Sequence, residues 1–126
     1  MKKRAMPEAD IQRNIVIFLR AVLPKGSIVH HAANEIASGS RAGRARQAIL
    51  VGMGVYPGFS DLVVISEGKV LFLEVKSRTG TLRQAQEEFR DAVIAQGLRW
   101  ALVRSIEDVM VALRYYHFAT RVAGGL

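Results

Sequence analysis

The 126-residue chain contains no cysteine. This excludes disulfide bonds, thiolate nucleophiles and cysteine-ligated zinc sites, and it fits an intracellular protein, where disulfides are rare. No apolar run approaches the ~20 residues that a membrane-spanning helix needs. The basic residues 1–4 are not followed by the apolar core of a signal peptide. We therefore expect a cytoplasmic protein that does not span a membrane.

Acidic side chains are also scarce, with 11 Asp and Glu against 18 Lys and Arg, and the net charge is +7. Residues 1–63 carry 9 basic and 4 acidic side chains, whereas residues 64–126 carry 9 and 7. A basic surface on a small domain favours a polyanionic partner, most commonly nucleic acid. Charge alone fits a soluble basic protein without such a partner equally well.

The chain has neither repeats nor linkers, and its length fits a single domain over residues 1–126. Apolar periodicity and turn residues predict helices over 7–23, 45–53, 81–96 and 105–114, and strands over 27–32, 62–65, 69–76 and 99–104. Thr81 is expected to cap the third helix. Residues 33–45 are expected to be irregular because their serines and glycines disfavour a helix. This order predicts an α/β fold with a mixed central sheet flanked by helices.

The most informative charged residues are Asp61, Glu74 and Lys76. Side chains alternate along a strand, so Glu74 and Lys76 share one face. Two charges at the end of an otherwise apolar strand indicate a functional role. Asp61 precedes the predicted turn at residues 67–68 by about the distance at which Glu74 follows it. We therefore expect the two carboxylates to meet at one end of a β-hairpin.

Two neighbouring carboxylates repel each other unless a cation lies between them. Oxygen ligands favour Mg²⁺ or Mn²⁺, and such an ion can bind a phosphate oxygen and lower the pKa of a bound water. Lys76 beside them could position that water or stabilise charge on phosphorus. The pattern favours a metal site over the alternative, in which Asp61, Glu74 and Lys76 are ordinary charged residues at a strand end.

Several motifs follow one another in a defined order. They are Glu8 and Gln12, Asn34-Glu35, Gly54 to Asp61, Glu74-Val75-Lys76, Gln86, and Gly97 with Val103-Arg104-Ser105. Together they resemble the motifs of the PD-(D/E)XK nuclease superfamily, and most closely those of its VRR-NUC branch. The resemblance extends over about residues 8–114. One departure is Ser60, which stands where proline often precedes the aspartate, a spacing that the superfamily tolerates.

This resemblance implies a restriction-endonuclease-like fold and a Mg²⁺- or Mn²⁺-dependent endonuclease that hydrolyses DNA. Asp61 and Glu74 would hold the metal, the Val75 carbonyl could complete the ligand set, and Lys76 would serve the attacking water. It also implies selectivity for branched or junction DNA and a homodimer that places two sites on two strands. The alternatives are a catalytically idle nucleic-acid-binding module with the same fold and a protein-interaction domain.

Two further residues are candidates for the same site. Gln86 falls on the apolar face of its predicted helix, and a buried amide needs a hydrogen-bond partner. It could therefore cap a sheet edge or reach the active site. Glu8 could complement the dipole of the first helix or act as an outer metal ligand. In both cases the resemblance favours the active site.

Residues 36–60 contain three arginines, Arg41, Arg44 and Arg46, and no acidic side chain. They lie near Lys25 and close to the predicted site in chain order, and we expect these four residues to contact DNA phosphates, the arginines from a loop. The alternative is a loop that only faces solvent.

Overall fold

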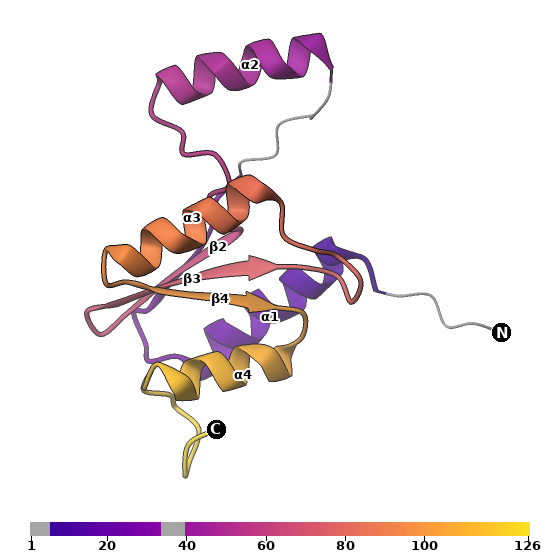
Figure 1. Cartoon of the computed structure of the whole chain (residues 1–126). Coiled ribbons are helices and arrows are strands. Elements are labelled where there is room, and N and C mark those ends of the chain that lie inside the picture. The colour runs from indigo at the N-terminus through magenta and orange to yellow at the C-terminus, as the bar shows by residue number, and fades with distance from the viewer. Residues whose placement is uncertain (1–5, 34–39) are drawn as a thin grey trace, which may run out of the picture.

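The computed structural model describes residues 6–33 and 40–126 (Figure 1). Its elements are α1 (Glu8–Val22), β1 (Ile28–His31), α2 (Arg41–Gly52), β2 (Leu62–Ser66), β3 (Lys69–Val75), α3 (Gln84–Ala95), β4 (Arg99–Val103) and α4 (Ile106–Tyr115). The strands form one sheet in the order β1-β2-β3-β4. The pairs β1–β2 and β2–β3 are antiparallel and the pair β3–β4 is parallel. The predicted α/β fold with a mixed sheet is confirmed.

Helices cover both faces of this sheet, with α3 on one face and α1 and α4 on the other (Figure 1). Alternate residues of β3 divide between the two faces. Leu71, Leu73 and Val75 are fully buried in the core against α1 and α4. On the other face Phe72 meets Phe89 of α3, with ring centroids 5.4 Å apart. Both faces of β3 are therefore covered, and only the end of the strand is accessible to a ligand.

The hairpin of β2 and β3 has the register that the sequence predicts. Ser66 pairs with Lys69 and Leu62 with Leu73, so Asp61 and Glu74 are the next residues outward. The turn is two residues long, and both have positive φ, 48° at Glu67 and 79° at Gly68. Such a turn matches the twist of the two strands and holds them in this register.

Two predicted helix boundaries are wrong. Helix α2 begins at Arg41 rather than at residue 45, because the Ser40 hydroxyl accepts a hydrogen bond from the Gly43 N–H at 2.9 Å and caps the helix. Helix α3 begins at Gln84 and is capped at Arg83 rather than at Thr81. There the Gln86 Oε1 accepts a hydrogen bond from the Arg83 N–H at 2.9 Å.

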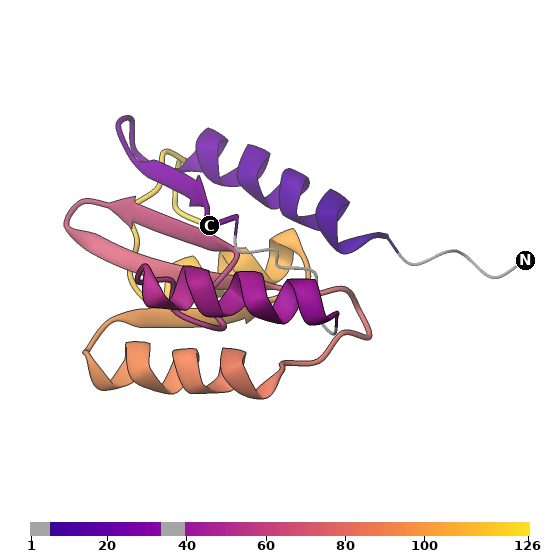
Figure 2. The ribbon, with the colours of Figure 1, turned by 90° about the horizontal axis from the view of Figure 1, so that it is seen from above.

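Helix α2 stands away from the sheet (Figure 1), and Gly43 is its one buried residue. Seen from above, α2 lies over the sheet and runs roughly along α3 (Figure 2). Ile49 of α2 and Met53, which directly follows the helix, are 65% and 78% exposed. None of the helices in the part of the chain that the structure describes has the length and apolar character to cross a membrane.

Candidate active site

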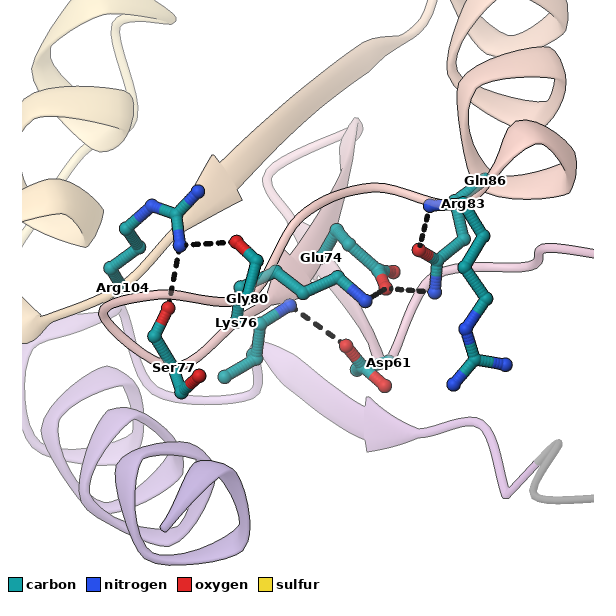
Figure 3. Close-up of polar contacts among 9 residues, drawn as sticks. Asp61, Glu74, Lys76, Ser77, Gly80, Arg83, Gln86 and Arg104 are labelled. Carbon is teal, nitrogen blue, oxygen red and sulfur yellow. Dashed lines mark hydrogen bonds and ion pairs between the residues drawn. The ribbon is translucent and has the colours of Figure 1, made fainter. Parts of the chain in front are cut away.

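Asp61 is held in place on both of its sides. Its carboxylate Oδ2 accepts a hydrogen bond from the Val75 N–H at 2.8 Å (Figure 3). Because β2 begins only at Leu62, the Asp61 side chain, rather than a backbone carbonyl of β2, accepts the hydrogen bond from Val75 of β3. On the side of β1, the Asp61 carbonyl accepts the Ala32 N–H at 2.9 Å and lies 3.0 Å from His31 Nδ1. The start of β2 is thus fastened to both neighbouring strands.

Glu74 is buried at the end of β3, with 1% of its surface exposed. Its Oε1 accepts a hydrogen bond from Gln86 Nε2 at 2.6 Å and lies 3.6 Å from Lys76 Nζ (Figure 3). Its Oε2 is buried and has no hydrogen-bond partner among the described residues. Lys76 is itself only 6% exposed. The site therefore holds a fixed, desolvated carboxylate with one oxygen left to bind a ligand.

Burial raises the pKa of Glu74 well above its ordinary value, to about 8. The neighbouring Asp61 carboxylate raises this pKa further, and Lys76 opposes the shift. Burial also raises the pKa of Asp61, against the hydrogen bond from Val75, and the charge of Glu8 adds to the increase. Two adjacent carboxyl groups with raised pKa values take up either a proton or a cation.

These side chains line one cavity of about 400 Å³. All five predicted catalytic residues reach it, Glu8 from α1, Asp61 from the start of β2, Glu74 and Lys76 from the end of β3 and Gln86 from α3. The remaining lining is Ala32, Gln47, Val51, Val55, Tyr56, Pro57, Gly58, Phe59, Arg83 and Ala85. The structure thus brings the predicted residues together, and their catalytic roles stay predictions.

Gly58 fixes the segment before Asp61 against the start of α3. Its φ is 76°, in the left-handed region that favours glycine. A Cβ atom at this position would lie 2.1 Å from the Ala85 carbonyl oxygen and 2.7 Å from the Gln86 nitrogen. The backbone of this turn therefore touches the backbone that carries Gln86, and any side chain at residue 58 would separate them.

The donor atoms fit a small divalent cation. Besides Glu74 Oε2 and the Asp61 carboxylate, the Val75 carbonyl faces the same side, because the N–H and C=O of one strand residue point the same way and the Val75 N–H meets Asp61. Such an all-oxygen set suits Mg²⁺ or Mn²⁺. No group of three His, Cys, Asp or Glu side chains that could hold a metal lies within residues 6–33 and 40–126. Water would therefore supply the remaining ligands, as is usual for Mg²⁺.

The predicted DNA-binding residues are placed differently. Arg41, Arg44 and Arg46 lie on α2 rather than in a loop, and none of them lines the cavity. Lys25 follows α1 at the far end of the sheet, where Ser27 Oγ lies 2.7 Å from Ser66 Oγ beside the hairpin turn. Closeness in chain order therefore does not bring Lys25 to the active site. Contact of these four residues with DNA stays a prediction.

Two further residues, His31 and Arg104, support the site without a role predicted from the sequence. His31 Nδ1 lies 3.0 Å from the Asp61 carbonyl and 3.0 Å from Gln12 Nε2 and can bond to one of them at a time, which places α1 and β1 beside the start of β2. Arg104 Nη1 donates to the carbonyls of Ser77 at 2.5 Å and Gly80 at 2.7 Å (Figure 3). It thereby holds the loop that follows Lys76. Both contacts join segments that are far apart in sequence, so a local sequence pattern does not predict them.

No protein-family model matches the sequence, and no curated protein matches it. The structure is similar to a solved structure described as a VRR_NUC domain protein, with a TM-score of 0.68 and 20% sequence identity. The match covers 90% of this chain and 89% of that chain. Similarity at this level of identity shows the fold, and the fold expected from the motifs is confirmed. The chain has the fold of a VRR_NUC domain protein.

Proposed function

We propose that the protein is a Mg²⁺- or Mn²⁺-dependent nuclease that hydrolyses phosphodiester bonds of DNA. The observation that carries this proposal is the pairing of Asp61 with the buried Glu74, whose Oε2 has no protein partner among the described residues. A divalent cation between these carboxylates offsets the cost of burying them. Lys76, buried beside Glu74, is the remaining member of the motif.

The residues of the cavity have different roles in the proposed reaction. Asp61, Glu74 and the Val75 carbonyl would hold the metal ion, which would supply a Lewis acid for a phosphate oxygen and for the attacking water. Asp61 is oriented by the Val75 N–H and Glu74 by the Gln86 amide, so both carboxylates are positioned before any ligand arrives. The Lys76 ammonium orients the attacking water and stabilises the charge that develops on the phosphate oxygens. Attack of water on phosphorus forms the new P–O bond and releases one proton to solvent, while the bond to the leaving oxygen breaks and that oxygen takes up a proton from solvent.

The basic charge supports DNA as the substrate. The net charge is +7. Arg41, Arg44 and Arg46 lie on α2, the helix that lies over the sheet (Figure 2). A basic helix that stands apart from the sheet can follow the backbone of a second DNA segment, which branched DNA offers. We therefore include selectivity for branched or junction DNA in the proposal.

The exposed apolar side chains of α2 support a homodimer. Ile49 and Met53 are 65% and 78% exposed, and a second copy of the chain would bury them. Light scattering with size-exclusion chromatography tests this part alone. A dimer is expected for the wild type and a smaller species for Ile49→Glu/Met53→Glu, and a wild-type monomer at cleavage concentrations contradicts it.

A cleavage panel tests the proposal as a whole. Duplex, flap, nicked, single-stranded and four-way DNA are incubated with the protein in Mg²⁺, Mn²⁺, Ca²⁺ or EDTA. We expect cleavage in Mg²⁺ or Mn²⁺ and none in EDTA, and Ca²⁺ should support binding better than cutting because its coordination is looser. Tight binding without cleavage under every condition would favour the idle binding module instead.

A further inference from the structure

Part of the lining of the cavity is apolar, although the same cavity contains Glu8, Asp61, Glu74 and Lys76. Val51 of α2 and the following Val55 and Tyr56 belong to this apolar part. Tyr56 is 50% exposed and Val51 is 42% exposed. Apolar surface is stabilised by removal from water, by roughly 25 cal/mol per Å². Apolar lining beside carboxylates that would hold a metal indicates a substrate with an apolar part next to its reacting group.

The Tyr56 ring packs against an aromatic cluster on one side and is open to solvent on the other. It makes an edge contact with Phe89, with ring centroids 5.4 Å apart and planes at 64°. Phe89 is 5% exposed and packs in turn against Phe59 and Phe72. The turn that follows Tyr56 is fixed by the close approach of Gly58 to α3. An aromatic side chain gains binding energy without a large ordering cost.

A charged residue completes the cavity on the side of α3. Arg83 lines the cavity and is exposed, and Figure 3 shows its side chain extending on the side of Asp61 and Glu74. Its backbone N–H is bound to Gln86, which also binds Glu74. The cavity therefore combines a guanidinium suited to phosphate, a candidate metal site and an aromatic ring, which together match a nucleotide.

We infer that Tyr56 stacks on an unpaired nucleobase beside the bond that is cut, so that the protein selects DNA with an unpaired nucleotide at that position. In a duplex both faces of each base are covered by neighbouring bases, whereas an unpaired base can offer a face to an aromatic side chain. This inference rests on the proposed nuclease function and adds the class of substrate. The same ring could instead pack on the deoxyribose, which an abasic nucleotide retains.

Cleavage of matched substrates tests the inference. Once the cut position is mapped, the nucleotide there is presented unpaired, replaced by an abasic residue, or fully paired, and kcat/KM is measured for the wild type, Tyr56→Phe and Tyr56→Ala. Stacking of one base on an aromatic side chain contributes about 1–3 kcal/mol, which corresponds to roughly 5- to 150-fold in kcat/KM. The wild type should lose this factor on the abasic and paired substrates. Tyr56→Ala should lose it on the unpaired substrate and little more on the abasic one, whereas Tyr56→Phe retains activity.

A matched control is Tyr115→Ala, since Tyr115 is 73% exposed and lies outside the cavity; it should behave as the wild type. Equal losses for Tyr56→Ala on the normal and abasic substrates overturn the inference, because the ring then acts on the sugar or on the fold. If Tyr56→Ala does not fold, the wild-type comparison alone decides: equal cleavage with and without the base overturns the inference.

A binding measurement separates this inference from the proposed nuclease activity. The fluorescent base 2-aminopurine is moved through the unpaired segment of a flap substrate, and its emission is recorded in EDTA or Ca²⁺, where no cleavage is expected. Quenching at one position by the wild type, and not by Tyr56→Ala, supports stacking even if the protein cuts no DNA. Cleavage without such quenching at any position leaves the nuclease intact and overturns the inference.

Discussion

The stability of the metal-free protein should fall as the pH rises, because folding buries Glu74. The folded protein holds the Glu74 proton up to about pH 8, whereas an unfolded chain releases it near the ordinary glutamate pKa of about 4.3. Between these values the unfolded state binds fewer protons, so the free energy of unfolding decreases with pH. The full stability is present below pH 4.3 and the loss is complete above about pH 8.

The size of this effect follows from the pKa shift. One pKa unit corresponds to about 1.4 kcal/mol, so the contribution of Glu74 across the whole window is at most about 5 kcal/mol. The pKa of about 8 already includes the opposing effect of Lys76 at 3.6 Å, and we expect a loss of a few kcal/mol within this upper limit. Glu74→Gln removes the titrating group and keeps an oxygen for the Gln86 amide. It also leaves Lys76 without its charged partner, so the diagnostic quantity is the slope against pH rather than the absolute stability.

Urea denaturation in EDTA between pH 5 and 8.5 measures both proteins. The wild type should lose stability across this range relative to Glu74→Gln. At pH 8, Mg²⁺ should restore stability to the wild type alone, by about 2.7 kcal/mol at 100 times its dissociation constant. If the stability of both proteins has the same dependence on pH, and Mg²⁺ stabilises neither, the reasoning that Glu74 is a buried carboxylate that binds a cation is refuted.

Three further predictions concern the residues around the site. Gly58→Ala should lower the free energy of unfolding by at least about 2 kcal/mol, since alanine is strained at positive φ and its Cβ would lie 2.1 Å from the Ala85 oxygen; wild-type stability would contradict the close packing. Arg104→Ala should lower the free energy of unfolding by about 1.5–3 kcal/mol and slow cleavage, because the loop after Lys76 loses the hydrogen bonds that hold it. The control is Arg78→Ala in the same loop, where the side chain is exposed and the change should be less than about 0.5 kcal/mol. Replacing the three arginines of α2 with alanine should weaken DNA binding and reduce the slope of log affinity against log salt by roughly 0.9 per lost phosphate contact; an unchanged slope in fluorescence anisotropy would show that α2 only faces solvent.

The meeting of Asp61 and Glu74 was predictable because it depends on local geometry. A two-residue turn sets the register of a hairpin, and the period of two along each strand sets which side chains share a face. The turn at Glu67-Gly68 therefore determines that Asp61 lies beside Glu74. For Gln86 the pattern predicted only that an amide on an apolar helix face needs a partner. The choice of the active site over a sheet edge came from the family resemblance, and Glu74 is the partner that the structure provides.

Other features depend on contacts that short patterns do not contain. Ser40 and Gly43 disfavour a helix interior, yet the same serine begins α2 as its cap. Lys25 is near α1 in sequence, but a helix of 15 residues spans about 22 Å and carries it away from Glu8. Arg104 reaches carbonyls 24 to 27 residues away, which only the assembled sheet brings within range.

The most direct test of the account is cleavage by the wild type and Asp61→Ala, with melting curves to show that both are folded. The wild type should cut branched DNA in Mg²⁺ and stop in EDTA. Asp61→Ala should be slower by roughly 10³-fold, because the metal supplies several kcal/mol of transition-state stabilisation. Full wild-type activity in EDTA, or an unchanged rate for folded Asp61→Ala, would contradict the claim that Asp61 and Glu74 hold a catalytic metal.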